Sequence, residues 1–362
     1  MTADVVSDSL EQPLVPRPHL GRRRRWDWKL VTGAVLIALV LAWILFFAHG
    51  TSAGAAIDEP GKFVVTLLDG LTLAGLYFIV ASGFTLIFGL MRTVNMAHGS
   101  LFLLAAYIAV EVQQRMVGKT RNITSDDVDM WSWALPLLIG SAIAAVIGFV
   151  IFAVFLRWNH GQELRQALIT LAISVILADQ ILAHAGGLAE SMAWPKGVTH
   201  FTQIFGQRYA TSRLFVLAIA LVVGGALWLW LNRTRMGIVI RAGVADEQMV
   251  RALGINIGIV FAITFFVGSF LAGMGGVMVA SFAGVSTGAD GQWLLHSLVV
   301  VIIGGLGSIR GAVAGAVLYG MVSAFAPAYL PRDYTYYSII FTFGLLAIVL
   351  AVRPYGLFGR PE

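Results

Sequence analysis

The sequence has 362 residues, of which 58% are hydrophobic and 12% are charged, and it carries a formal net charge of +5. Soluble domains carry about a quarter charged residues, so this chain has too little polar surface for a water-soluble globule. Its basic residues stand between apolar stretches, which argues against a nucleic-acid partner, and the absence of cysteine excludes disulfides and cysteine-ligated metals. We expect an all-α protein, a polytopic transmembrane helical bundle.

The amino-terminal region divides into a polar part and an apolar part. Residues 1–29 contain three prolines and the run Arg22 to Arg25, which predicts a basic, disordered cytoplasmic tail beside an anionic membrane surface. Residues 30–48 predict an extra amino-terminal transmembrane helix. A cleaved signal sequence is the alternative, because small residues follow at 53–56.

Nine further apolar stretches bring the expected number of membrane segments to about ten. Residues 63–90 are too long for one straight crossing, and residues 101–112 are too short. Because Gly83 and Gly89 interrupt the long stretch, we predict a broken or tilted helix there, with a re-entrant turn at 91–100. The other stretches are residues 135–156, 168–182, 214–231, 258–282, 294–309, 312–325 and 336–352.

Charge between the stretches predicts the orientation. With the amino terminus in the cytoplasm, about two thirds of the 24 Lys and Arg fall on the cytoplasmic side, as the positive-inside rule requires. Both termini are then cytoplasmic, and residues 353–362 form a cytoplasmic carboxy-terminal tail. The acidic stretch around Asp126, Asp127 and Asp129 lies outside.

One predicted cytoplasmic loop, residues 232–256, contains a short helix of its own. Residues 245–253 are helix formers, with Asp246 and Glu247 early and Arg251 late. That order suits the helix dipole, which is positive at the start of a helix and negative at its end. Glu247 and Arg251 are also four residues apart with the acid first, the better orientation for an ion pair.

The same short helix has an apolar face and a marked end. Gly254 stands where a helix carboxy-terminal glycine is expected, and Met249, Val250 and Leu253 form the apolar face. An amphipathic helix at this place has two interpretations, which composition leaves open. Either it lies on the lipid headgroups, or it docks into a groove of a partner protein.

A few residues at membrane depth are candidates for the path of a solute. Asn95 and His98 are polar side chains just after the long stretch, where they either contact solute or cap a helix near the interface. Gly83, Gly304 and Gly305 are candidates because glycine lets the backbone approach a ligand or open a re-entrant turn. Close helix packing is the alternative for the glycines.

Six stretches, in order along the chain, carry a resemblance to a known family. They are DGLTLAGLYFIVASGFTLIFGLM (69–91), VNMAHG (94–99), RMGIVIRAGVADEQMVRALGIN (235–256), FFVGSFLAGMGGVM (265–278), IIGGLGSIRGAVAG (302–315) and RPYGLFGRPE (353–362). The chain resembles the permease subunits of branched-chain amino acid ABC importers, of the high-affinity leucine/isoleucine/valine type. The resemblance implies a permease domain over residues 63–352 in the inner, or plasma, membrane of a bacterium.

The resemblance implies a complex rather than a solitary carrier. A second permease, identical or homologous, would join two cytoplasmic ABC ATPase subunits and an extracytoplasmic solute-binding protein, all at a lipid membrane. The short loop helix would couple ATPase movement to alternating access. The coupling residues are Ala245, Asp246, Glu247, Met249, Arg251, Leu253 and Gly254.

This chain is expected to bind no cofactor and to be no enzyme. ATP would be used by the partner subunits, because the chain lacks a Walker A motif: Gln113 replaces the first glycine before Gly118-Lys119-Thr120. Its histidines are scattered, and HExxH does not occur. The alternatives are a permease for urea or short amides, whose importers share these motifs, and an ion-coupled secondary transporter.

The sequence departs from the family pattern at three places. The region before residue 60 is longer than the family leads one to expect. The loop RWNHGQELR (157–165) lacks an Arg-Pro-Leu-like run, and Asp69 stands where asparagine is more usual. These departures leave open a substrate different from the branched-chain amino acids.

Overall fold

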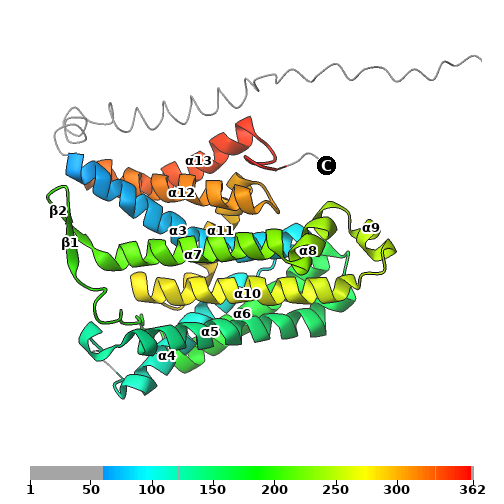
Figure 1. Cartoon of the computed structure of the whole chain (residues 1–362), viewed down its shortest axis with the longest axis horizontal. Coiled ribbons are helices and arrows are strands. Elements are labelled where there is room, and N and C mark those ends of the chain that lie inside the picture. Colours follow the sequence, from blue (N-terminus) through cyan, green and yellow to red (C-terminus); the bar gives the residue numbers. More distant parts are fainter. Residues whose placement is uncertain (1–59, 121–122, 331, 360–362) are drawn as a thin grey trace, which may run out of the picture.

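The computed structural model describes residues 60–120, 123–330 and 332–359 (Figure 1). The predicted basic tail (1–29), the predicted extra span (30–48) and the end of the carboxy-terminal tail therefore lie outside the described residues.

Helices dominate the described chain. They are α3 (Pro60–Met91), α4 (His98–Val117), α5 (Met130–Ile151), α6 (Glu163–Ala185), α7 (Thr211–Arg233), α8 (Arg235–Ala245), α9 (Glu247–Ala252), α10 (Ile257–Phe282), α11 (Ala289–Gly304), α12 (Ile309–Tyr329) and α13 (Ser338–Val352). A π-helical turn (Phe152–Leu156) and a 3-10 turn (Arg157–Asn159) extend α5, and strands β1 (Phe201–Ile204) and β2 (Gln207–Ala210) form an antiparallel hairpin.

The predicted fold class is confirmed. Within the described ranges, seven helical segments are long and apolar enough to cross a membrane, and α11 is a shorter apolar helix. Each of the nine apolar stretches predicted after residue 60 coincides with a helix, because the hydrocarbon requirement of about 20 apolar residues leaves a strong mark on sequence. α4 runs beyond its predicted stretch, since Glu111 and Arg115 on its last turns form an ion pair with each other.

Of the two alternatives for the long stretch, a broken or a tilted helix, the broken helix is wrong, and the irregular turn after it is present. α3 continues unbroken through Gly83 and Gly89 to Met91, a length of about 48 Å at 1.5 Å per residue. Residues 92–97 are then non-helical, and α4 begins at His98. The ring of His98 contacts the carbonyl oxygen of Val80 in the inner part of α3, so the chain turns back into the bundle before α4 starts.

The same arrangement occurs twice, in opposite directions. α3, a six-residue connector, α4, α5 and α6 follow one another in the first half, as α10, a six-residue connector, α11, α12 and α13 do in the second. α3 packs against α12 as α10 packs against α5, and α4 contacts α10 as α11 contacts α3. Because α3 starts beside the hairpin and α10 starts beside α9, the two halves are inverted (Figure 1).

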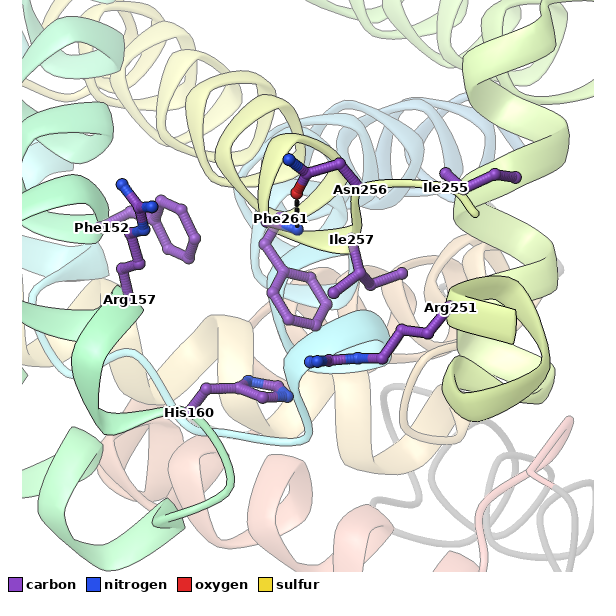
Figure 2. A pocket seen from close by; sticks show the side chains of 9 residues that line it. Phe152, Arg157, His160, Arg251, Ile255, Asn256, Ile257 and Phe261 are labelled. Atoms are coloured by element: carbon purple, nitrogen blue, oxygen red, sulfur yellow. Dashed lines mark hydrogen bonds between the residues drawn. The ribbon is translucent and has the colours of Figure 1, made fainter. Parts of the chain in front are cut away.

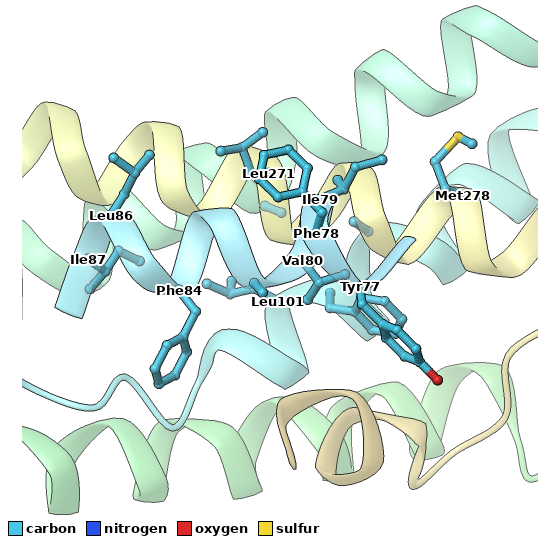
Figure 3. Packing of buried hydrophobic residues seen from close by; sticks show 14 of the residues in the cluster. Tyr77, Phe78, Ile79, Val80, Phe84, Leu86, Ile87, Leu101, Leu271 and Met278 are labelled. Carbon is cyan, nitrogen blue, oxygen red and sulfur yellow. The ribbon is translucent and has the colours of Figure 1, made fainter. Parts of the chain in front are cut away.

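The centre of the bundle is the packing of α3 on α10. Figure 3 shows side chains of α3 such as Ile79 and Val80 beside Leu271 and Met278 of α10, all fully or almost fully buried. Glycine makes this approach possible: a Cβ atom at Gly83 would collide with the carbonyl oxygen of Gly268. The packing interpretation therefore accounts for Gly83 by direct contact between backbones.

The two ends of the bundle differ in character. One end carries the β1–β2 hairpin and the long segment before it, where Gln113 of α4 bonds the backbone of Ala193 in both directions. Asp69, ten residues into α3, pairs there with Arg213 of α7. The other end carries α8 and α9 (Figure 1). We refer to these as the hairpin end and the α9 end.

Candidate functional site

The loop at the α9 end contains two helices where the sequence predicts one. The prediction of a continuous helix over residues 245–253 is wrong, since Ala245 ends α8 and Asp246 adopts an extended backbone (φ −156°, ψ 99°). The carboxylate of Asp246 accepts a hydrogen bond from the Met249 amide at 2.9 Å. Asp246 is thus the N-cap of α9, a position that aspartate strongly favours.

The predicted end of this helix is confirmed. Gly254 has φ +78°, a left-handed conformation that glycine adopts without strain. Its amide donates to the carbonyl oxygen of Arg251 at 3.0 Å, which closes the last turn.

Charged side chains tie α9 to a second loop. The carboxylate of Glu247 accepts hydrogen bonds from Arg251 Nε at 2.9 Å and from Arg251 Nη2 at 2.6 Å, so the predicted ion pair is confirmed. The same oxygen lies 3.0 Å from His160 Nε2, in the connection between α5 and α6. His160 is 87 positions away in sequence, and no local pattern pointed to it.

The predicted apolar face of α9 is divided between two surroundings. Val250 is buried in the bundle, with 2% of its surface exposed, whereas Met249 is 58% exposed and Leu253 is 71% exposed. One apolar side chain therefore anchors the helix, and two others are presented at the surface.

A cavity of about 350 Å³ lies beside α9 (Figure 2). It is bounded by the π-helical and 3-10 turns after α5, by α9 and by the start of α10. Its lining residues are Phe152, Arg157, His160, Arg251, Ile255, Asn256, Ile257, Gly258 and Phe261.

Two of the predicted path residues, His98 and Gly83, meet inside the bundle. The His98 ring is fully buried, with Nε2 3.0 Å from the Val80 carbonyl oxygen and the ring edge-on to Phe84. Gly83 adjoins it, since a Cβ there would lie 3.1 Å from His98 Cε1. His98 Nδ1 has no hydrogen-bond partner among the described residues. The capping interpretation of His98 is wrong, because its side chain contacts the carbonyl oxygen of Val80 in the interior of α3 and not the end of that helix at Met91.

Asn95 shapes the turn that leads into α4. It is 2% exposed, and its side-chain oxygen accepts a hydrogen bond from the Ala97 amide at 3.1 Å. The next residue, Met96, donates its amide proton to the hydroxyl of Thr170 in α6 at 3.1 Å. The irregular segment is thereby held against α6.

Gly304 and Gly305 lie elsewhere, at the far end of α11. Gly304 meets the backbone of Gly311, and Gly305, with φ +102°, meets the backbone of Gly359. The Phe358 amide donates to the Gly304 carbonyl oxygen at 2.9 Å, so this turn binds the carboxy-terminal segment. The structure therefore does not bring these two glycines together with His98; their role in a solute path stays a prediction.

One polar group at the contact between α4 and α11 was missed by the sequence analysis. Asp290, in the first turn of α11, is half-buried, and its carboxylate accepts a hydrogen bond from the Ser100 hydroxyl of α4 at 3.2 Å. The Ser100 hydroxyl is 2.7 Å from that of Ser174 in α6. The Asp290 carbonyl oxygen lies against Gly99, next to His98, so the start of α11 packs on the start of α4. We call Ser100, Ser174 and Asp290 the polar junction.

Asp290 was missed because it lies just outside the predicted span. That span began at residue 294, so Asp290 was assigned to a loop. An ionisable side chain within a membrane segment marks a functional site by default, because an unused charge there is costly.

Comparison with known proteins identifies the architecture. Residues 66–350 match the family model described as branched-chain amino acid transport system / permease component. The chain belongs to this family. The permease is 28% identical over 307 residues to the high-affinity branched-chain amino acid transport system permease protein LivH of Escherichia coli (strain K12), covering 83% of this chain and 96% of that protein.

Two further relatives show the breadth of similarity. The permease is 27% identical over 317 residues to the high-affinity branched-chain amino acid transport system permease protein BraD of Pseudomonas aeruginosa, with 84% of this chain and 99% of that protein covered. It is 22% identical over 316 residues to the galactose/methyl galactoside import permease protein MglC of Salmonella typhimurium, with coverage of 84% and 88%. The predicted family is confirmed: this chain is a transmembrane permease of the ABC transporter class.

Proposed function

We propose that this permease provides the membrane path of a binding-protein-dependent ABC importer for branched-chain or related amino acids. Membership of the family supports the class of transporter, and the two relatives with the highest identity named above transport branched-chain amino acids according to their names. MglC, whose name gives a sugar as its substrate, is less similar. The solute would arrive from a binding protein at the hairpin end and leave at the α9 end.

The observation that carries the coupling part of this proposal is the exposed apolar pair on α9. Met249 and Leu253 protrude from a helix that Val250 and the Glu247 ion pairs hold in place. A fixed helix with an apolar face suits docking into a groove of a partner. We assign this face to one of two ATPase subunits at a cytoplasmic α9 end, with both termini cytoplasmic and a second permease beside this one.

Movement of α9 would then switch the path between outward and inward access. ATP binding to the partner favours one of two arrangements of the permease, and α9 transmits that preference to α10 and to the α5–α6 connection through Val250 and His160. The chain itself would hold no nucleotide.

Leu253→Asp tests the docking face. A buried charge at an interface of this kind costs enough to lower ATPase co-elution from the purified complex by about tenfold or more. Leu188→Asp is the matched control, because Leu188 is 63% exposed at the hairpin end. Unchanged co-elution and uptake in Leu253→Asp would remove α9 from the docking surface.

We assign the ammonium group of the solute to Asp290. At neutral pH an amino acid carries a positively charged ammonium group, which urea, short amides and galactose lack. Asp290 presents a half-buried carboxylate whose hydroxyl partner is Ser100. His98 and Asn95 would support the path from behind rather than line it, since both are buried.

The solute retained by the partner binding protein tests the substrate directly. Mass spectrometry of that purified protein is expected to show a branched-chain or related amino acid. Retained urea or a short amide would favour the alternative importer. Uptake into proteoliposomes that needs an ion gradient and no internal ATP would favour a secondary transporter.

A further inference from the structure

The cavity beside α9 is lined by basic side chains on one side and by apolar side chains on the other. Arg157 comes from the 3-10 turn after α5, Arg251 from α9, and His160 lies between them in sequence position and in space (Figure 2). Phe152, Ile257 and Phe261 line the remaining side. The space is large enough for a small headgroup and is not filled by a side chain of the described residues.

The cavity is lined by more positively charged than negatively charged side chains. Glu247 is the carboxylate that pairs with Arg251 and His160. Arg157 packs over the Trp158 ring, with its guanidinium carbon 5.4 Å from the ring centroid, and has no ion pair in the described part of the chain. The lining residues thus include two arginines and no carboxylate, and only Arg251 is paired, with Glu247, so the cavity favours an anion.

Exposed apolar side chains stand on the same two turns that contribute Phe152 and Arg157 to the cavity. Val154 and Phe155 in the π-helical turn are 53% and 45% exposed, and Trp158 is 75% exposed. A partly exposed tryptophan beside exposed aliphatic residues, next to arginine, is typical of the level at which a helix leaves the bilayer. An anion bound here would have an apolar chain surface directly beside it.

We propose that this cavity binds the phosphate of an anionic membrane phospholipid, with an acyl chain along the exposed face of the π-helical turn. Arginine presents several N–H donors in a fork that matches phosphate oxygens. Free phosphate shares that chemistry, but the apolar wall and the exposed Val154 and Phe155 favour a ligand with a hydrocarbon chain.

The bound phosphate would also act on α9. Arg251 and His160 now share one oxygen of Glu247, so a phosphate between Arg157 and Arg251 would compete with Glu247 for the same donors. The headgroup would link α9 to the turn after α5. This consequence for coupling rests on the proposed function; the lipid site itself does not.

The test uses the full-length permease in detergent with phosphatidylglycerol or phosphatidylcholine of identical acyl chains, and native mass spectrometry as the readout. The unchanged protein is expected to retain phosphatidylglycerol at least fivefold better than phosphatidylcholine. Arg157→Gln should remove most of that preference, and Arg157→Lys should keep it. Arg235→Gln is the matched control, because Arg235 is exposed at the same end and does not line the cavity.

Two outcomes would overturn the proposal, and neither needs a transport measurement. An equal loss of preference in Arg157→Gln and Arg235→Gln would overturn it, since the attraction would then be general to the basic end. Displacement of phosphatidylglycerol by millimolar inorganic phosphate would overturn the lipid as ligand in favour of free phosphate. Loss of transport function, with lipid preference intact, would concern only the proposed function.

Discussion

The α9 loop and the polar junction differ in how their residues come together. On α9, Asp246 caps the Met249 amide and Glu247 pairs with Arg251, so most contacts join residues three or four apart. In the polar junction, Ser100 meets Ser174 across 74 positions and Asp290 across 190. The loop follows from local helix rules, whereas the junction exists only because α4, α6 and α11 pack together. Substitutions of polar side chains should therefore have large effects at the junction, and substitutions of the capping and ion-pair residues should have small effects on the loop.

The largest effect is expected at Gly83, in the contact between α3 and α10 at the centre of the bundle. Gly83→Ala places a methyl group against the Gly268 carbonyl oxygen and close to the His98 ring, so α3 and α10 must separate. Overpacking of this kind costs about 1–3 kcal/mol of unfolding free energy. Thermal unfolding of the purified permease, followed by size-exclusion chromatography, should show a lower midpoint and loss of monodisperse protein.

Gly225→Ala is the control for this change. Gly225 lies in α7 with open space around the Cβ position, so alanine there should stabilise the helix by up to about 1 kcal/mol. Opposite signs at the two glycines are the expected result. A midpoint that rises in both variants would show that α3 and α10 do not need glycine at their contact.

The sequence predicted most of the fold because membrane spans obey a simple rule. Hydropathy and length located every span after residue 60, and helix-dipole and capping rules located Glu247, Arg251 and Gly254. The sequence did not predict two kinds of feature. The separation of α8 from α9 at Asp246 was not predicted, because Ala245 before it and Glu247 after it both favour helix, and the capping role of Asp246 shows only in its backbone geometry.

The sequence did not predict the polar junction, for a different reason. Nothing near Asp290 in sequence distinguishes it from a loop acid at the start of a span. Its importance comes from Gly99 and Ser100, brought alongside by the turn at residues 92–97, and that turn is a tertiary feature. The same limit applies to His160, whose partner Glu247 lies on another loop.

A second prediction tests the junction at the level of transport, and rests on the proposed function. Asp290→Asn keeps the shape of the side chain and the Ser100 contact but removes the negative charge. A hydrogen bond to a charged group is worth about 1.5–3 kcal/mol, so amino acid uptake at saturating loaded binding protein should fall by at least about tenfold. Uptake of labelled leucine into proteoliposomes with internal ATP is the measurement.

Asp246→Asn makes the same chemical change on the loop. Asparagine caps a helix as well as aspartate does, so uptake should stay within about twofold of the unchanged permease. Equal uptake by both variants would contradict a role for the Asp290 charge. A fall confined to Asp246→Asn would reverse the comparison and place the critical charge on the loop.

The smallest effect is expected at the ion pairs of α9. Glu247→Gln removes the charge that Arg251 and His160 share, at groups that are 29–50% exposed. Pairs of this exposure contribute about 0.3–0.5 kcal/mol each, so the loss of both should make the backbone amides of α9 exchange hydrogen about three- to fivefold faster. Since the interaction is screened, the difference between the variants should shrink in 1 M salt.

Glu111→Gln is the control that distinguishes an ion pair within one helix from the contact that joins α9 to the α5–α6 connection. Glu111 and Arg115 form an ion pair of the same spacing on α4, and among the described residues they have no histidine partner. Its loss should speed exchange only in the last turns of α4. Glu247→Gln should also speed exchange around His160, 87 positions away, because one carboxylate holds both loops. Faster exchange confined to α9 would mean that the His160 contact does not join them, and the loop would then be as local as its sequence suggests.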